Sequence, residues 1–420
     1  PQVKRTEEGA NVLRTYASLM ETPFDEELLE WHVTGQLATV NVENRRETRI
    51  GQPSMIRSFD FSPTGQHTRV TIMQRPFSFV VPVTSIGRVE QVWDRSGTMM
   101  VELDMTELNT GIRGAPSAPG VAGDEEETDR RQLAWREDGA GLTFLQQEEA
   151  PEVDEDEAEA RPGRGARAGN RAPRADRVML WAAPFDDESL TVVYEADQRM
   201  SSHRFSEDHE MLFIMRRPGG GGRGGGGFGR AGGGGGTVTE YAVDLADPET
   251  TYTLAEYDSD DFYANPGSLL MAGGRVAGGG RGRGGRGGGG GGIVQTSADG
   301  GSVFFAGTTY NEDPMVEGPK NFLDRVEIRT GETERIFEAG NAGQRERIVS
   351  VLDVDEARFV VSRETPTEIA QSYLLAGGQW TQLTQNIDYT PDISGAPRQR
   401  FTVERPDGFR FLVNVTLPPG

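Results

Sequence analysis

The motif FDFSPTG at residues 59–65 decides the fold, because relatives of this motif recur along the chain. In each copy, an apolar or β-prone residue precedes small or polar residues and then Asp-Gly or a related pair. Asp-Gly favours a tight turn, since Gly tolerates positive φ and Asp hydrogen-bonds to its own backbone. The other copies are WREDG (135–139), FSEDH (205–209), TSADG (296–300) and the more divergent LDVDE (352–356).

Alternating apolar residues follow the turns, as Leu142 and Phe144 do after WREDG. Side chains two residues apart lie on one face of a strand, so these copies predict strand, turn, strand. A second alternating pair of strands follows each copy, at 89–105, 177–195, 239–254, 324–338 and 371–384. Repetition of a four-stranded unit predicts an all-β fold, a β-propeller of four-stranded blades. The alternative, a β-sandwich with coincidental Asp-Gly turns, does not explain the repeated order of two hairpins.

The blade count follows from these copies. Residues 30–50 are interpreted as the outer strand pair of an earlier blade, which brings the visible blades to about six. Residues 1–29 form a separate N-terminal segment, in which 7–20 and 24–31 are each expected to form a short helix. The predicted propeller domain is 30–395.

The amino-acid composition excludes some classes of binding partner. The 420 residues include 35% hydrophobic residues, enough for a sizeable core, and carry a net charge of −23 with Lys only at positions 4 and 320. Such an acidic surface repels nucleic acid and anionic membranes, so neither is expected as a partner. No stretch reaches the ~20 apolar residues of a membrane helix. Absence of Cys excludes disulfides and thiolate metal sites.

Four low-complexity segments interrupt the blade pattern, near 111–129, 148–176, 218–236 and 273–292. Their Gly-, Arg- and acid-rich composition cannot bury enough apolar area to offset ordering entropy, so we expect disordered inserts. The alternative is that the Gly/Arg tracts bind RNA. The acidic body of the chain opposes that hypothesis, as does the single aromatic residue of the tracts, Phe228.

Known catalytic and metal-binding motifs are missing from the sequence. The four His residues have no metal-ligand spacing, and neither Gly-x-Ser-x-Gly nor a P-loop occurs, so we expect no cofactor and no metal site. His209 occupies the Gly position of its turn, which favours a structural role. A lactonase or glycosidase with its active site in the central channel would need carboxylates or His on inner strands, whereas the identifiable inner positions are mostly apolar.

The C-terminal stretch RQRFTVERPDGFRFLVNVTLPPG (398–420) differs from the blades. It predicts a strand, a Pro-Asp-Gly turn and a second strand, and it does not repeat the blade pattern. A propeller followed by such a hairpin and LPPG resembles the junction in prolyl oligopeptidase-type serine peptidases, where the hairpin opens an α/β-hydrolase domain.

Other stretches resemble the glutamyl endopeptidase branch of that superfamily. They are RPFSFVVPV (75–83), VWDRSG (92–97), DDFYANPGS (260–268), GPKNFLDRVEIRTGETERIFEA (318–339) and SRETPTEIAQSYLL (362–375). The resemblance covers roughly 51–420 with gaps at the inserts, and it rests on the order of individually weak motifs. It implies seven or eight blades in the whole protein and a truncated α/β-hydrolase domain from 396.

The resemblance also implies peptide substrates cleaved after Glu by a Ser-Asp-His triad beyond residue 420, with no catalytic residue in this chain. The propeller would cover the active site and restrict access, with its own C-terminal hydrolase domain as partner. Bacterial enzymes of this kind are often exported, which favours a periplasmic or secreted location and leaves the cytoplasm open. The start at Pro1 suggests a fragment or a mature product.

Cleavage after Glu requires a positive group near the substrate side chain. Arg75, Phe77 and Arg363, which lie in the family-like stretches, are therefore the substrate-facing candidates. The alternative is that each arginine pairs with a neighbouring carboxylate for structure.

A second hypothesis for the chain is a stand-alone TolB-like propeller that binds proteins or peptides. In that case its last strand, within 401–417, would complete a blade.

Overall fold

The computed structural model describes residues 19–109, 130–148, 174–217, 236–276, 292–313, 315, 317–340 and 343–418. The predicted inserts therefore lie largely outside the described residues, as does the predicted helix at 7–20. At the edges of two of the predicted inserts, β-strands begin at Asp176 and lie at Arg275–Val276.

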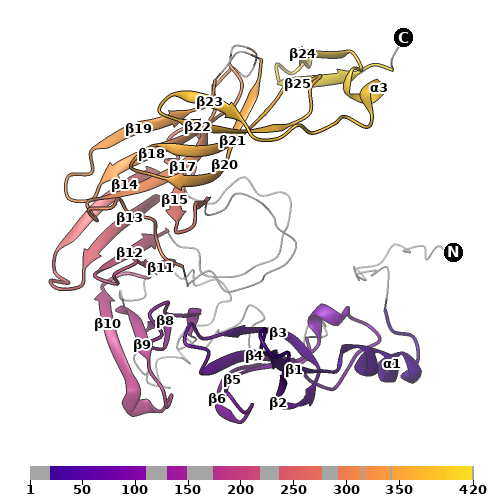
Figure 1. Cartoon of the computed structure of the whole chain (residues 1–420), viewed down its shortest axis with the longest axis vertical. Coiled ribbons are helices and arrows are strands. Elements are labelled where there is room, and N and C mark those ends of the chain that lie inside the picture. The colour runs from indigo at the N-terminus through magenta and orange to yellow at the C-terminus, as the bar shows by residue number, and fades with distance from the viewer. Residues whose placement is uncertain are drawn as a thin grey trace, which may run out of the picture. The chain divides into compact units, whose positions relative to one another are not determined.

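The described residues form a nearly all-β structure of antiparallel sheets, each built from strands consecutive in the chain (Figure 1). The first sheet is the pair β1 (Gly35–Val40) and β2 (Glu47–Ser54). Five larger sheets follow. They are β3–β6 (Ile56–Phe61, His67–Met73, Arg88–Asp94, Met99–Thr106), β7–β10 (Arg131–Trp135, Leu142–Gln147, Asp176–Trp181, Leu190–Ala196), β11–β14 (Ser202–Phe205, Met211–Arg216, Thr237–Asp244, Thr251–Asp258), β15–β19 (Ser268–Met271, Arg275–Val276, Ser302–Thr309, Lys320–Glu327, Thr333–Glu338) and β20–β23 (Arg345–Asp353, Arg358–Glu364, Gln371–Ala376, Gln379–Gln382).

This arrangement confirms the predicted all-β fold of four-stranded propeller blades. Four of the five larger sheets have four strands, and the fifth gains the short β16 at its edge. The second strand pairs are all found where the alternation placed them. The predicted hairpin near the C-terminus is also present, as β24 (Arg398–Glu404) and β25 (Arg410–Thr416), after the short helix α3 (Pro391–Ser394). The domain boundaries and the total number of blades stay predictions.

The chain divides into two compact units. Unit 1 comprises residues 1–131, 135–192 and 222–226, and unit 2 comprises 132–134, 193–221 and 227–420. In unit 1, helix α1 (Pro23–Val33) contains the predicted helix at 24–31. Its N-cap is Thr22, whose hydroxyl accepts the Asp25 N–H in a capping box. In the described part of the chain, no helix is long and apolar enough to cross a membrane.

The recurring motif forms the same turn in successive sheets. In three copies a Ser hydroxyl accepts the backbone N–H five residues later: Ser62 from His67 at 3.0 Å, Ser206 from Met211 at 2.9 Å and Ser297 from Ser302 at 2.9 Å. The fourth residue of each of these turns has positive φ: 64° at Gly65, 60° at His209 and 71° at Gly300. His209 thus takes the left-handed conformation of a Gly, as predicted.

Central strands are buried on both faces, which the alternating pattern alone does not predict. On β17, Phe304 is fully buried among residues of the following sheet, including Phe359 and Val361. Its neighbour Phe305 points the other way and packs with Phe213 and Ala242 of the preceding sheet. Sheet β15–β19 is therefore packed between two neighbouring sheets of unit 2, as a propeller blade is.

One copy of the motif departs from strand, turn, strand. Around TSADG, Thr296 pairs with Val303, but Val294 donates its N–H to the Phe205 carbonyl of the preceding sheet at 2.8 Å. The strand that pairs with β17 is instead β15, with Leu269 opposite Phe305. The prediction was wrong here because long-range backbone pairing outcompetes the local hairpin beyond its first pair of residues.

Unit 2 also contains a buried acid, Glu240 on β13, which is 1% exposed. Within the described residues its Oε1 atom has no hydrogen-bond partner. Burial raises the Glu240 pKa to about 7, although the nearby Arg204 and Arg217 oppose the shift. A buried carboxyl with an unsatisfied oxygen is destabilising once ionised.

We expect Gly300→Ala to lower the free energy of unfolding by about 1–2 kcal/mol, because an L-residue is strained at φ 71°. Gly318→Ala is the matched control, since a Cβ meets no atom within 4 Å at either position and Gly318 lacks positive φ. Urea unfolding of the two variants measures the difference. Equal stabilities would contradict the left-handed geometry of the turn.

Glu240 predicts a pH dependence of stability. Its pKa is about 7 in the folded chain and near the ordinary 4.5 when unfolded, so its penalty is absent below pH 4.5, grows as pH rises and levels off above 7. Glu240→Gln should therefore match the wild type at pH 4 and exceed its stability at pH 8 by on the order of 2–3 kcal/mol. Parallel stability profiles of the two proteins between pH 4 and 8 would exclude this role.

Candidate functional site

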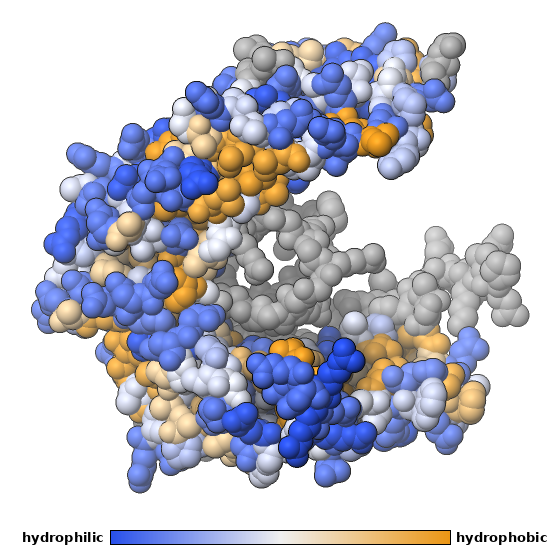
Figure 2. Space-filling model, viewed as in Figure 1, coloured by the Kyte–Doolittle hydropathy of each residue, from blue (hydrophilic) through white to orange (hydrophobic). Residues whose placement is uncertain are grey.

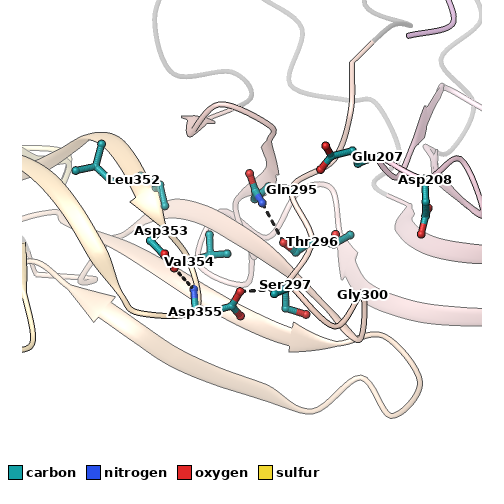
Figure 3. A pocket seen from close by; sticks show the side chains of 12 residues that line it. Glu207, Asp208, Gln295, Thr296, Ser297, Gly300, Leu352, Asp353, Val354 and Asp355 are labelled. Carbon is teal, nitrogen blue, oxygen red and sulfur yellow. Dashed lines mark hydrogen bonds between the residues drawn. The ribbon is translucent and has the colours of Figure 1, made fainter. Parts of the chain in front are cut away.

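The recurring turns of unit 2 enclose a hollow of about 440 Å³ (Figure 3). Three chain segments contribute to it: the turn after β11, the segment that leads into β17, and the end of β20 with the turn that follows. The residues that line it are Glu207, Asp208, Gln295, Thr296, Ser297, Ala298, Gly300, Val351, Leu352, Asp353, Val354 and Asp355.

Side-chain caps fix the shape of these turns. Ser297 donates its hydroxyl to Asp299 Oδ1 at 2.6 Å, and Asp299 Oδ1 also accepts the Gly301 N–H. Ser206 and Asp208 repeat this arrangement in the preceding sheet. The Ser hydroxyls are thus already engaged as donors as well as acceptors, which argues against a nucleophilic role.

A single hydrogen bond joins two neighbouring turns across the hollow. Asp355 Oδ2 accepts the backbone N–H of Ala298 at 2.9 Å, although the two residues are 57 positions apart in the chain (Figure 3). Asp353 caps its own turn by accepting the N–H groups of Asp355 and Glu356. Rigid, hydrogen-bonded backbone turns therefore form the walls of the hollow.

The hollow is acidic. Among the described residues, it is lined by the carboxylates of Glu207, Asp208, Asp353 and Asp355, and by no Lys, Arg or His. The Ser206 hydroxyl and the Glu210 N–H lower the Asp208 pKa, so this carboxylate stays ionised at neutral pH. The carboxylates of the described lining favour cationic groups. In the described residues, no group of three or more His, Asp or Glu is placed to hold a metal ion.

The structure places Arg75 and Phe77 together in unit 1. The Arg75 guanidinium lies 4.7 Å from the centre of the Phe77 ring, and its Nε donates to Glu30 of α1 at 3.0 Å. Glu26 lies 3.6 Å away and adds a second carboxylate. Phe77 itself is 7% exposed and packs with Met73 and Ile86.

Arg363 lies in unit 2, on β21. Its Nε and Nη2 both contact Glu346 Oε1, at 2.9 and 2.6 Å, and its guanidinium carbon lies 3.9 Å from the centre of the Trp380 ring. Glu346 is buried and also accepts the Gly340 N–H at 2.7 Å. Arg75 and Arg363 thus both have carboxylate partners, and their substrate-facing role stays a prediction.

Sequence reasoning did not identify the hollow, although its acidic residues are visible in the motif. FSEDH and LDVDE carry Glu207, Asp208, Asp353 and Asp355, for which the motif predicts only a role in turns. A turn that recurs in adjacent sheets brings its polar positions to the same edge, and that repetition was the available signal.

Comparison with known proteins supports the resemblance to glutamyl endopeptidases. No family model matches the chain. The chain is similar to a rice protein named "Probable glutamyl endopeptidase, chloroplastic", with 22% identity over 434 residues that cover 99% of this chain and 40% of the relative. The Arabidopsis thaliana protein of the same name is 22% identical over 423 residues, covering 97% and 38%. The chain thus spans about two fifths of the length of the curated relatives that it matches.

Solved structures show weaker similarity to the chain. Prolyl oligopeptidase B from Galerina marginata aligns with a TM-score of 0.37 and 11% identity, covering 88% of this chain and 48% of that one. TolB from Acinetobacter baumannii aligns with a TM-score of 0.28 and 10% identity, covering 79% and 57%. The sequence similarity to the two proteins named glutamyl endopeptidases covers 99% and 97% of the chain, including its propeller sheets.

Asp355→Ala should lower the free energy of unfolding by about 1–2 kcal/mol, because it leaves the Ala298 N–H without its carboxylate partner. The control is Glu249→Ala, which removes an exposed carboxylate that makes no side-chain hydrogen bond within the described part of the chain. Denaturant midpoints of both variants provide the comparison. A loss of the same size in the control would mean that the bond between the turns contributes nothing specific.

Proposed function

We propose that this chain is the propeller portion of a serine peptidase of the prolyl oligopeptidase type that cleaves peptides after Glu. The observation that carries the proposal is the similarity to proteins named glutamyl endopeptidases along 99% of the chain but only 40% of their length. The catalytic Ser, Asp and His would belong to a hydrolase domain beyond residue 420. The propeller would then restrict which peptides reach that domain.

The hairpin β24–β25 supports this proposal over the TolB-like alternative. Its two strands pair with each other through seven residue pairs, from Arg398 opposite Thr416 to Glu404 opposite Arg410, and form a two-stranded sheet of their own. Phe401, Phe409 and Phe411 are 40–60% exposed. An exposed aromatic hairpin suits the start of a further domain, which would cover these side chains.

Within this proposal, the two arginine candidates would contact a substrate Glu although each already lies beside a carboxylate. Arg363 is held by Glu346 and the Trp380 ring, so it would contact a substrate Glu only by sharing its remaining N–H donors. Arg75 is more exposed and lies beside Glu26 and Glu30, whose negative charges reduce its attraction for an acidic side chain. The favoured periplasmic or secreted location and the bacterial source stay predictions beside this proposal.

The test is an assay of the protein encoded by the whole gene on chromogenic peptides that end in Glu, Gln, Pro or Ala before the chromophore. We expect cleavage after Glu that a serine-directed inhibitor abolishes. Cleavage after Pro alone would overturn the Glu specificity. A gene that encodes no Gly-x-Ser-x-Gly after residue 420 would overturn the peptidase proposal and favour the binding module.

Variants of the same protein separate recognition from folding. If Arg363 contacts the substrate, Arg363→Gln should raise KM for Glu peptides about tenfold while leaving Ala peptides unchanged, since one charged hydrogen bond is lost. A thermal melt of the variant checks the fold, because Glu346 loses its partner. An equal change for both peptides would assign Arg363 a structural role.

A further inference from the structure

Unit 2 carries an exposed aromatic patch that neither the core nor the acidic hollow uses. Phe262 and Tyr263 lie in the connection between β14 and β15, and Tyr310 follows β17 (Figure 1). These three side chains are 58%, 55% and 43% exposed. The Phe262 ring lies 4.4 Å from Tyr310 and 5.6 Å from Tyr263, centre to centre, so the three rings form one cluster. We call these three residues the aromatic patch.

The loops that carry the patch are held by hydrogen bonds. Asp261 Oδ1 accepts the N–H groups of Tyr263 and Ala264, and Asn265 Oδ1 accepts the Gly267 N–H. Gly267 approaches strand β17 so closely that a Cβ there would lie 2.4 Å from the Ala306 carbonyl oxygen. Exposed aromatic side chains on fixed loops lose little entropy when they bind a partner.

The rim of the aromatic patch is strongly acidic. The loop residues beside it include the exposed carboxylates Asp258, Asp260, Asp261, Glu312 and Asp313. Within the described residues, none of these five has an ion-pair partner. The cation closest in sequence, Lys320, is paired with Glu317 and Glu338. Among the described residues, the patch therefore combines ring faces with carboxylates that no ion pair neutralises.

We propose that the aromatic patch binds an extended peptide that carries arginine beside an aromatic or apolar residue. A guanidinium stacks on Tyr and Phe rings and pairs with carboxylates, so it uses both features of the site at once. Acidic peptides would be repelled by the rim. Such a site would select peptides by residues away from the scissile bond, a role that deepens the proposed peptidase function without requiring catalysis by this chain.

Fluorescence anisotropy on the chain tests this directly, with labelled Gly-Arg-Phe-Arg-Gly and Gly-Glu-Phe-Glu-Gly as probes. We expect saturable binding of the arginine peptide and none of the glutamate peptide. Phe262→Ala/Tyr310→Ala should weaken binding of the arginine peptide about tenfold. Asp260→Asn/Asp261→Asn keeps the amide oxygens that can cap the loop, and it should reduce both the affinity and its salt dependence.

The control is Tyr389→Ala, which removes an aromatic ring that is 87% exposed elsewhere in unit 2. Equal affinity of the wild type and Phe262→Ala/Tyr310→Ala would overturn the proposal, as would equal binding of the two peptides.

Sedimentation of the same proteins tests whether a second copy of the chain occupies the aromatic patch instead. A concentration-dependent dimer that the double variant abolishes, without peptide binding, would assign the patch to a second copy of the chain instead. If the chain binds the arginine peptide but the protein encoded by the whole gene does not cleave after Glu, the binding site is supported and the proposed peptidase function is overturned.

Discussion

One small local interaction underlies the rest of the fold: the hydroxyl-capped turn that recurs in three of the sheets. A Ser oxygen that accepts an amide proton five residues later closes a loop of fixed length, and the residue at positive φ sets its hand. Because the loop length is fixed, the register of the strands that the turn joins is fixed too, as for β3 with β4 and for β11 with β12. On β17, whose partners are β15 and β18, a one-residue slip would exchange the faces to which Phe304 and Phe305 point, and both cores of sheet β15–β19 would lose a main side chain.

Turns capped by Asp explain part of the chain's acidity. Asp94, Asp208 and Asp299 each accept a Ser hydroxyl and backbone N–H groups within a tight turn, and these bonds lower the pKa of each carboxyl. Asp208 and Asp299 belong to the recurring motif, whereas Asp94 begins the turn between β5 and β6. The net charge of −23 is thus partly a consequence of building many turns with Asp. Within the described residues, the carboxylates around the hollow and the aromatic patch have no ion-pair partner, and they favour cationic groups at both places.

Much of the fold could be predicted from the sequence, because turns and alternating strands are local signals. Alternation of apolar residues located the second strand pairs, the recurring motif located the left-handed His209, and the Pro-Asp-Gly turn located the terminal hairpin. What could not be predicted depended on residues distant in the chain. Nothing near TSADG indicates that residues 268–271 pair with β17, or that Ala298 and Asp355 bond across 57 positions. The exposed rings of Phe262 and Tyr310 likewise come from separate loops, and only the folded chain brings them within 4.4 Å.

The two-sided burial of β17 has a consequence for how the chain tolerates change. A sheet whose opposite faces belong to two different cores has no hydrophobic interior of its own, so its stability resides in contacts with its neighbours. Connections between strands tolerate added residues more readily than the strands do, because most residues of both cores lie on strands. A whole sheet, by contrast, could not be excised as a module: its removal would leave two unlike faces that have never been selected to meet.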